Sequence, residues 1–183
     1  MSRMPQLTAE TANDEQRALL EDTNRQLGRV PNLYAAMANG PAALKGYLAM
    51  RDALVAGSFR ARVREQLALL IAQENECGYC VAAHTMRGGK VGLSEEQLLA
   101  TRRAESDDPH TTAVLQVARE AMRSGGRLTD DVVEQARAAG VTDAELAEII
   151  GHIALNVFSN YFNHLAQPDL DFPAVDVAVT ASH

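Results

Sequence analysis

Hydrophobic residues in this 183-residue chain recur every three or four positions, and glycine or proline interrupts each series. This spacing predicts amphipathic helices, because it places apolar side chains on one helical face. Valine and isoleucine do not alternate with polar residues, so little of the chain suits a sheet. We therefore predict an all-α fold. Helices are expected at residues 14–27, 32–39, 41–56, 63–75, 79–87, 111–123, 129–139 and 142–167, with a short helix capped by Ser94 and Gln97.

The order of these segments indicates one domain with two extensions. The chain is long enough to bury a single core. We expect the helical domain over residues 14–167, after an N-terminal arm of residues 1–13 and before an extended tail of residues 168–183. In an oligomer, this tail could cross onto a neighbouring subunit.

The predicted helix from Val63 to Asn75 is apolar over most of its circumference, so it is expected to be buried. Its strongest stripe is formed by Val63, Leu67, Leu70 and Ile71. Glu65 points roughly the opposite way, among other apolar residues. Because burial disfavours the charged form of a carboxyl group, this acid needs a partner.

Both cysteines of the chain follow directly, at the start of the next predicted helix, which Gly88 and Gly89 are expected to end. Cys80 and His84 are four residues apart and share a helical face, and Cys77 lies one turn earlier. A free thiol has a pKa of about 8.5, so only about 3% is thiolate at neutral pH. A helix N-terminus and a nearby imidazole both favour the thiolate.

The last predicted helix begins at Thr142, which Glu145 follows with the spacing of a capping box. Asn160 and His164 fall on one face near its end, which is unusual for a purely structural surface, and both are candidate pocket residues. The other histidines, His110, His152 and His183, have no comparable neighbours and are interpreted as structural. The stripe predicted to face the core is formed by Leu146, Ile150, Ile153, Val157 and Tyr161.

Charge and hydropathy exclude several classes of function. A net charge of −7 argues against a nucleic-acid-binding surface, which needs clustered lysine and arginine. No apolar run approaches the roughly 18 residues that cross a membrane. The N-terminal segment has no apolar export signal, so a cytoplasmic location is expected.

Two cysteines separated by two residues do not form a disulfide scaffold, and such pairs more often serve redox or metal chemistry. Alternatively, the two cysteines form a buried pair without any chemical role. A zinc site could use Cys77 and Cys80 with His84 and His164 as further ligands. Redox use is the preferred interpretation, because the candidate ligands are not arranged as paired zinc knuckles. No metal or cofactor is expected.

The pattern E-x11-C-x-Y-C-x3-H, from Glu65 to His84, resembles the core motif of the AhpD-like alkylhydroperoxidases, in the carboxymuconolactone decarboxylase superfamily. The resemblance covers about three quarters of the chain. It implies an all-helical fold that assembles into trimers or larger rings such as hexamers. Further similar segments are Val30-Pro31-Asn32-Leu33, Gly40-Pro41, residues 44–57 and Asn160-Tyr161-Phe162-Asn163-His164.

The resemblance also implies an activity, the thiol-dependent reduction of small hydroperoxides. Carried over position by position, Cys80 attacks the peroxide and Cys77 is its disulfide partner. Glu65 and His84 form the proton relay, and Tyr79 lines the site. An external dithiol of the lipoyl or thioredoxin type would then reduce the disulfide.

Three alternatives stay open at this stage. In a thioredoxin-like disulfide reductase, Cys77 at the helix tip would be the nucleophile. A lactone decarboxylase on the same scaffold would not need the cysteines. A non-catalytic scaffold oligomer would not depend on Glu65.

Overall fold

The computed structural model describes residues 2–178, which form nine helices and no strand, so the predicted all-α fold is confirmed. The last five residues of the predicted tail, including His183, lie outside the described residues. None of the helices in the described range is long and apolar enough to cross a membrane. The helices are α1 (Asp14–Leu27), α2 (Asn32–Met37), α3 (Pro41–Val55), α4 (Ala61–Glu74), α5 (Gly78–Lys90), α6 (Glu95–Arg102), α7 (Pro109–Ser124), α8 (Asp130–Ala138) and α9 (Asp143–Ala166).

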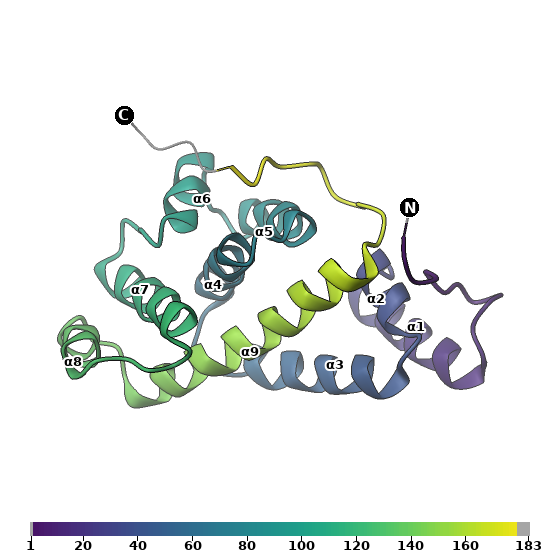
Figure 1. Ribbon diagram of the computed structural model, residues 1–183, viewed down its shortest axis with the longest axis horizontal. Coiled ribbons are helices and arrows are strands. Elements are labelled where there is room, and N and C mark those ends of the chain that lie inside the picture. Colours follow the sequence, from purple (N-terminus) through teal and green to yellow (C-terminus); the bar gives the residue numbers. More distant parts are fainter. Residues whose placement is uncertain (1, 179–183) are drawn as a thin grey trace.

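Helix α4 lies at the centre of the molecule and packs against α5, α6, α7 and α9 (Figure 1). Its side chains Leu67, Leu69, Leu70 and Ile71 are fully buried although they point in different directions around the helix. A helix that is apolar on nearly every side must be covered on nearly every side. The predicted burial of this helix is therefore confirmed.

Helix α5 is longer than its sequence predicts, because it continues through Gly88 and Gly89 to Lys90. The prediction that these two glycines end the helix is wrong. Gly88 instead allows α6 to approach, since a Cβ atom at this position would lie only 2.6 Å from Leu98 Cδ2. The chain turns later, at Gly92, whose φ of +87° suits glycine.

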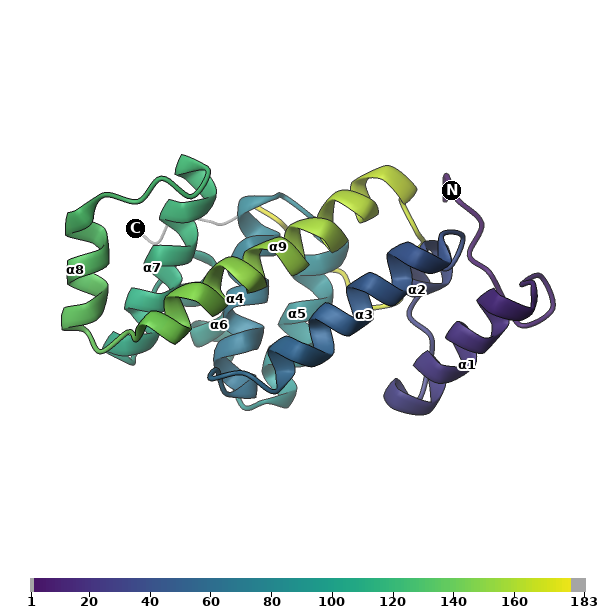
Figure 2. The same ribbon diagram turned by 90° about the horizontal axis from the view of Figure 1, so that it is seen from below.

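Helix α9 crosses the molecule and runs beside α3 (Figure 2). Its start is as predicted, with the capping box of Thr142 and Glu145 formed. The predicted core stripe is partly wrong: Leu146 and Ile153 pack against the core, but Ile150 and Tyr161 are 47% and 62% exposed. The helix instead buries a row that is partly polar, consisting of Ile149, His152, Leu155, Asn156, Ser159, Asn160, Asn163 and Ala166. A prediction from hydrophobicity alone misassigned part of this face, because the buried row includes polar residues that lie beside the cysteines.

The segments that flank the helices both pack against the rest of the chain. The backbone N–H of Arg3 donates to the carbonyl of Ala166 at 2.7 Å, so the N-terminal segment meets the end of α9. After α9, the C-terminal segment passes over α5 toward α6 (Figure 1). Gln73 and Arg102 donate hydrogen bonds to the carbonyl of Val177. The described part of the tail therefore packs against helices of the same chain.

Candidate active site

Cys77 is positioned by the turn that joins α4 to α5. Its backbone N–H donates to the carbonyl of Ala72 at 2.9 Å, and that of Glu76 donates to Gln73 at 3.0 Å, which together form a Schellman motif. Glu76 adopts a left-handed φ of 52°, a position that usually favours glycine. This turn makes Cys77 the N-cap of α5 and places Cys80 in the first turn.

The two sulfur atoms lie close together and are shielded from solvent. Cys77 is 2% exposed and Cys80 is 3% exposed. The side-chain amide of Asn163, on α9, lies 3.5 Å from Sγ of Cys77 and 3.2 Å from Sγ of Cys80, so it contacts both sulfurs. Sequence reasoning missed Asn163, although it lies between the candidates Asn160 and His164.

Hydrogen bonding shifts the pKa values of the two thiols in opposite directions. The hydrogen bond from the Cys80 thiol lowers the pKa of Cys77, and the Cys80 backbone N–H and Asn163 add to this effect against burial. The same hydrogen bond with Cys77, together with burial, raises the pKa of Cys80 well above its ordinary value. In the reduced pair, the first negative charge is therefore favoured on Cys77 and the remaining proton on Cys80.

Glu65 and His84 form the predicted pair, with Oε2 of Glu65 lying 2.8 Å from Nδ1 of His84. Their side chains are 22% and 13% exposed, respectively. Burial disfavours the ionised form of Glu65, but His84 and the nearby Arg87 and Arg64 outweigh it and hold the pKa of Glu65 below its ordinary value. Within residues 2–178, no hydrogen bond joins His84 to either sulfur, although His84 lies one helical turn after Cys80 on α5.

Tyr79 packs against the cluster that contains both cysteines, and it also meets the C-terminal tail. Its hydroxyl donates to Oδ1 of Asp171 at 2.5 Å and accepts from the backbone N–H of Leu33 at 3.3 Å. Burial and the bond to Asp171 raise the pKa of Tyr79, so the phenol stays protonated near neutral pH. Its ring contacts Phe172 edge to face, at 5.3 Å between ring centroids.

The other two pocket candidates both contact Asn75, the residue that ends α4. The buried Asn160 accepts a hydrogen bond from the Asn75 side chain at 2.9 Å. The exposed His164 places Nε2 2.9 Å from the carbonyl oxygen of Asn75. His164 therefore helps to fix the turn that precedes Cys77, whereas the Asn160 side chain also hydrogen-bonds Cys80 and works against the rise in the pKa of that thiol.

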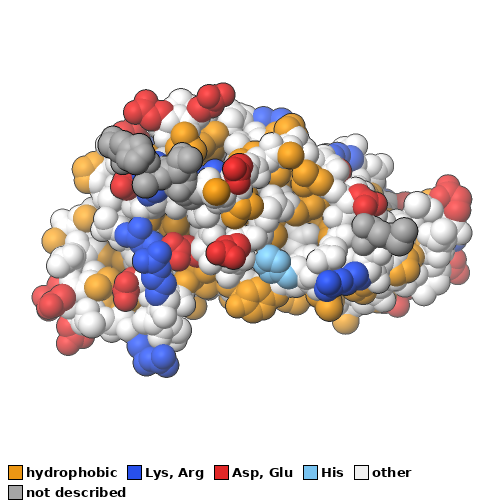
Figure 3. Space-filling model, turned by 45° about the horizontal axis from the view of Figure 1, so that its top comes forward, with side chains coloured by type: hydrophobic (Ala, Val, Ile, Leu, Met, Phe, Trp, Pro, Cys, Tyr) orange, Lys and Arg blue, Asp and Glu red, His pale blue; other side chains and the backbone are white. Residues whose placement is uncertain are grey.

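The tail covers the cysteine side of α5. Val175 packs against the cysteine cluster, and Arg102 donates to the carbonyl of Asp176 at 2.7 Å. Asp171 also forms an ion pair with Arg29 at 3.3 Å. On the face that the tail crosses, hydrophobic side chains lie among scattered charged groups (Figure 3). The tail therefore limits access to the sulfurs from this side.

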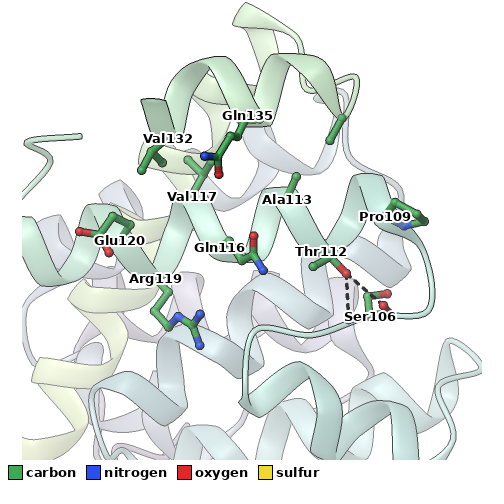
Figure 4. Close-up of a pocket in the computed structure, with 12 residues that line it drawn as sticks. Ser106, Pro109, Thr112, Ala113, Gln116, Val117, Arg119, Glu120, Val132 and Gln135 are labelled. Atoms are coloured by element: carbon green, nitrogen blue, oxygen red, sulfur yellow. Dashed lines mark hydrogen bonds between the residues drawn. The ribbon is translucent and has the colours of Figure 1, made fainter. Parts of the chain in front are cut away.

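A separate cavity of about 480 Å³ lies between α7 and α8 (Figure 4). Thr112 and Ser106 hydrogen-bond at its edge. Its lining contains Arg119 and Glu120, but neither a cysteine nor a histidine of the described chain. It therefore offers no nucleophile comparable to the thiol pair.

The side chains of the described residues are not arranged as the alternative zinc site would require. Among the described residues, no group of three or more His, Cys, Asp or Glu side chains is placed to hold a metal ion. His84 is paired with Glu65, and His164 is bonded to the Asn75 carbonyl. The two histidines are thus engaged away from the sulfurs.

Comparison with known proteins shows a family resemblance and a shared fold. Residues 41–124 match the sequence model described as "Carboxymuconolactone decarboxylase family", and this range contains Glu65, both cysteines and His84. The fold is similar to that of an uncharacterized peroxidase-related protein with an alkylhydroperoxidase AhpD core from Ralstonia eutropha JMP134. The TM-score is 0.80, with 23% identity over 93% of this chain and 92% of that chain. Over residues 41–124 the chain is therefore similar to the carboxymuconolactone decarboxylase family, and its fold is that of AhpD-like proteins.

Members of this superfamily are usually enzymes. A peroxidase-related protein from Silicibacter sp. TM1040 has a similar fold, with a TM-score of 0.77 and 21% identity over 93% of this chain and 92% of that chain. The debrominase Bmp8, solved with 2,3,4-tribromopyrrole, gives a TM-score of 0.75 and 16% identity over 93% of this chain and 92% of that chain. At these identities the likeness shows a shared fold. No curated protein matches the chain.

Proposed function

We propose that this protein is a thiol peroxidase that reduces small alkyl hydroperoxides with Cys77 and Cys80. The observation that carries the proposal is the close pair of buried thiols, both contacted by Asn163, one helical turn from the Glu65–His84 pair. In an AhpD-like protein, this arrangement supplies a nucleophile, a second thiol and a proton relay together.

In the proposed cycle, Glu65 and His84 take the proton from Cys80, directly or through water. The Cys80 sulfur attacks the terminal peroxide oxygen, the O–O bond breaks, and the proton goes to the departing alkoxide. Cys77 then attacks the sulfenic acid, which forms the disulfide and releases water. Two thiols and one hydroperoxide thus give one disulfide, one alcohol and one water. An external dithiol of the lipoyl or thioredoxin type, in the cytoplasm, restores the thiols.

A second candidate exchanges the roles of the two sulfurs, with Cys77 as the nucleophile of a disulfide reductase. The order of the pKa shifts favours this candidate, because the thiolate is favoured on Cys77. Trapping with a dimedone-type reagent after exposure to peroxide separates the two. Labelling at Cys80 supports the proposed cycle, and labelling at Cys77 alone overturns the assignment of roles.

The activity itself is tested by hydroperoxide consumption with a lipoamide-type dithiol. We expect turnover by the parent protein and a loss of more than about 100-fold in Cys77→Ser and in Cys80→Ser, since each removes one half of the disulfide. A lactone enzyme on this scaffold would keep its activity in the double cysteine variant. Because the fold also occurs in a debrominase, the assay includes a brominated pyrrole. Debromination without hydroperoxide consumption would contradict the proposal.

We also propose that the protein is a homo-oligomer, a trimer or a hexamer, that uses the outer face of α9. Four large hydrophobic side chains on this helix are between 42% and 62% exposed: Ile150, Phe158, Tyr161 and Leu165. Such a row suits contact with a second copy of the chain. Light scattering should show an oligomer that Tyr161→Glu with Leu165→Glu dissociates. A monomeric parent protein would contradict this part of the proposal.

A further inference from the structure

Two adjoining cavities lie beside His84. The inner cavity, of about 160 Å³, is lined by residues of α3, α4, α5 and α9 that include Glu65 and His84. The outer cavity, of about 460 Å³, reaches α1 and the tail. The two share Tyr34, Arg51 and Arg87, so they form one continuous space, which we call the arginine cleft. The cysteines do not line it.

The arginine cleft is positively charged although the protein as a whole carries a net charge of −7. Only two carboxylates line it, and each has a partner: Glu65 pairs with His84, and Asp52 pairs with Arg51. Five basic side chains line it: Arg29, Arg51, Arg64, Arg87 and Lys90. Basic groups gathered in a concave, low-dielectric site attract an anion more strongly than the same groups on an open surface.

Several polar groups in the arginine cleft have no hydrogen-bond partner. The Nη1 atom of Arg51 and the Nε2 atom of His152 are buried without a hydrogen bond, and His152 is only 3% exposed. Within the described range, the Arg87 side chain forms no hydrogen bond or ion pair, and its guanidinium lies 5.9 Å from the ring centroid of Phe172. A buried polar group without a partner destabilises the protein, and a ligand that pairs with it removes this cost.

The remaining lining determines what else the ligand carries. Leu54, Val55, Ala68 and Leu155 are apolar, and the ring of Tyr47 lies among them. Such a wall suits a hydrocarbon or aromatic body, and a few polar groups fix its orientation. The inner cavity is large enough only for a small organic molecule.

We propose that the arginine cleft binds substrates that carry a carboxylate on a small apolar body. Arg51 and Arg87 hold the carboxylate, since a guanidinium pairs with it through parallel hydrogen bonds. The other end of the molecule points toward His84, one helical turn from Cys80. This inference rests on the proposed peroxidase function, for which it names a substrate class: hydroperoxides of small organic acids. The carboxylate itself is unchanged in the reaction.

A binding measurement tests the substrate class without requiring any turnover. The Cys77→Ser/Cys80→Ser variant is titrated with para-carboxylated cumyl alcohol, a product-like probe, and with the methyl ester of that compound. We expect the acid to bind about tenfold more tightly than the ester, and Arg87→Met in this background to bring the two dissociation constants together. Arg127→Met removes the same charge from an exposed residue outside the cleft and should preserve the difference.

Equal binding of acid and ester, or a preference unaffected by Arg87→Met, would overturn the inference. So would displacement of the acid by inorganic phosphate at equal concentration, because any anion would then suffice. The matching kinetic experiment compares kcat/KM for para-carboxylated cumene hydroperoxide and its methyl ester, with the acid favoured about tenfold. Turnover of both peroxides at equal rates refutes the cleft assignment alone. Acid binding without consumption of either peroxide refutes the peroxidase proposal alone.

Discussion

The surroundings of the cysteines and of His84, one helical turn apart on α5, differ in how completely the protein satisfies its own polar groups. Around the cysteines, both sulfurs are buried, hydrogen-bonded to each other and to Asn163, and covered by the tail. Beside His84, the arginine cleft is hollow, and within the described residues Arg87 forms no hydrogen bond or ion pair. A closed, satisfied site protects a reactive group, whereas an open site with unpaired donors awaits a ligand. The comparison suggests that the redox chemistry lies at one turn of α5 and that substrate recognition begins at the next turn.

Among the substitutions that test this comparison of the cysteines with His84, Glu65→Gln should have the largest effect. It keeps the size of the side chain but removes its charge. Hydroperoxide consumption should fall about 100-fold, because a proton relay typically contributes at least this much. The exposed Glu134→Gln is the matched control and should retain full activity. If Glu65→Gln consumed hydroperoxide at the parent rate, proton transfer from the thiols to the Glu65–His84 pair would be excluded.

The pH dependence of hydroperoxide consumption also tests the role of Glu65. Since the pKa of Glu65 is held below its ordinary value, its ionised form persists as the pH falls through the usual carboxyl range. Activity that depends on ionised Glu65 should therefore be lost only at more acidic pH than an ordinary glutamate would allow. The profile of kcat/KM from neutral to acidic pH measures this.

Packing on the cysteine side is tested by a pair of neighbouring glycines. Gly88→Ala should destabilise the protein by about 1–3 kcal/mol, because its Cβ would meet Leu98 and over-pack the contact between α5 and α6. Gly89→Ala should be neutral or stabilising by up to about 1 kcal/mol, since nothing lies within 4 Å of its added atom and alanine suits a helix interior. Chemical denaturation measures both, and equal effects would refute the assigned role of Gly88.

The cover over the sulfurs is tested by ending the chain at Pro168. Without the tail, alkylation of the thiols by iodoacetamide should be about tenfold faster, because the tail packs over the cysteine cluster and its removal exposes the sulfurs. Asp171→Asn, which weakens the clamp on Tyr79 and Arg29, should give a smaller increase in the same direction. An unchanged rate in the truncated protein would show that the tail does not limit access.

The smallest effect is expected from Asn163→Leu, which keeps the approximate size of the side chain but removes its donor group. Since Asn163 helps to lower the pKa of Cys77, the pH profile of Cys77 alkylation should move to higher pH. The exposed Asn24→Leu, on α1, serves as the control. A profile that does not move would exclude Asn163 from tuning the thiol pair.

Local patterns predicted most of the helices, because helical periodicity and capping residues act over a few positions. They indicated only that Glu65 needs a partner, and the Glu65–His84 contact was expected from the resemblance to AhpD-like proteins. They did not predict Asn163, since three polar residues at the end of α9 are equivalent on a helical wheel until the helix is placed against α5. They misassigned Ile150 and Tyr161 for the same reason, and Gly88 because its role depends on the approach of α6. The tail packs against its own chain through contacts with residues that are distant in the sequence, such as Tyr79. No local pattern specifies such contacts.

The most direct test of the central claim is a single-turnover titration of the reduced protein with one equivalent of alkyl hydroperoxide, without an external dithiol. We predict that two thiols disappear for each hydroperoxide consumed, and that peptide mass spectrometry finds the Cys77–Cys80 disulfide within one chain. Hydroperoxide that persists while both thiols remain titratable would contradict the account.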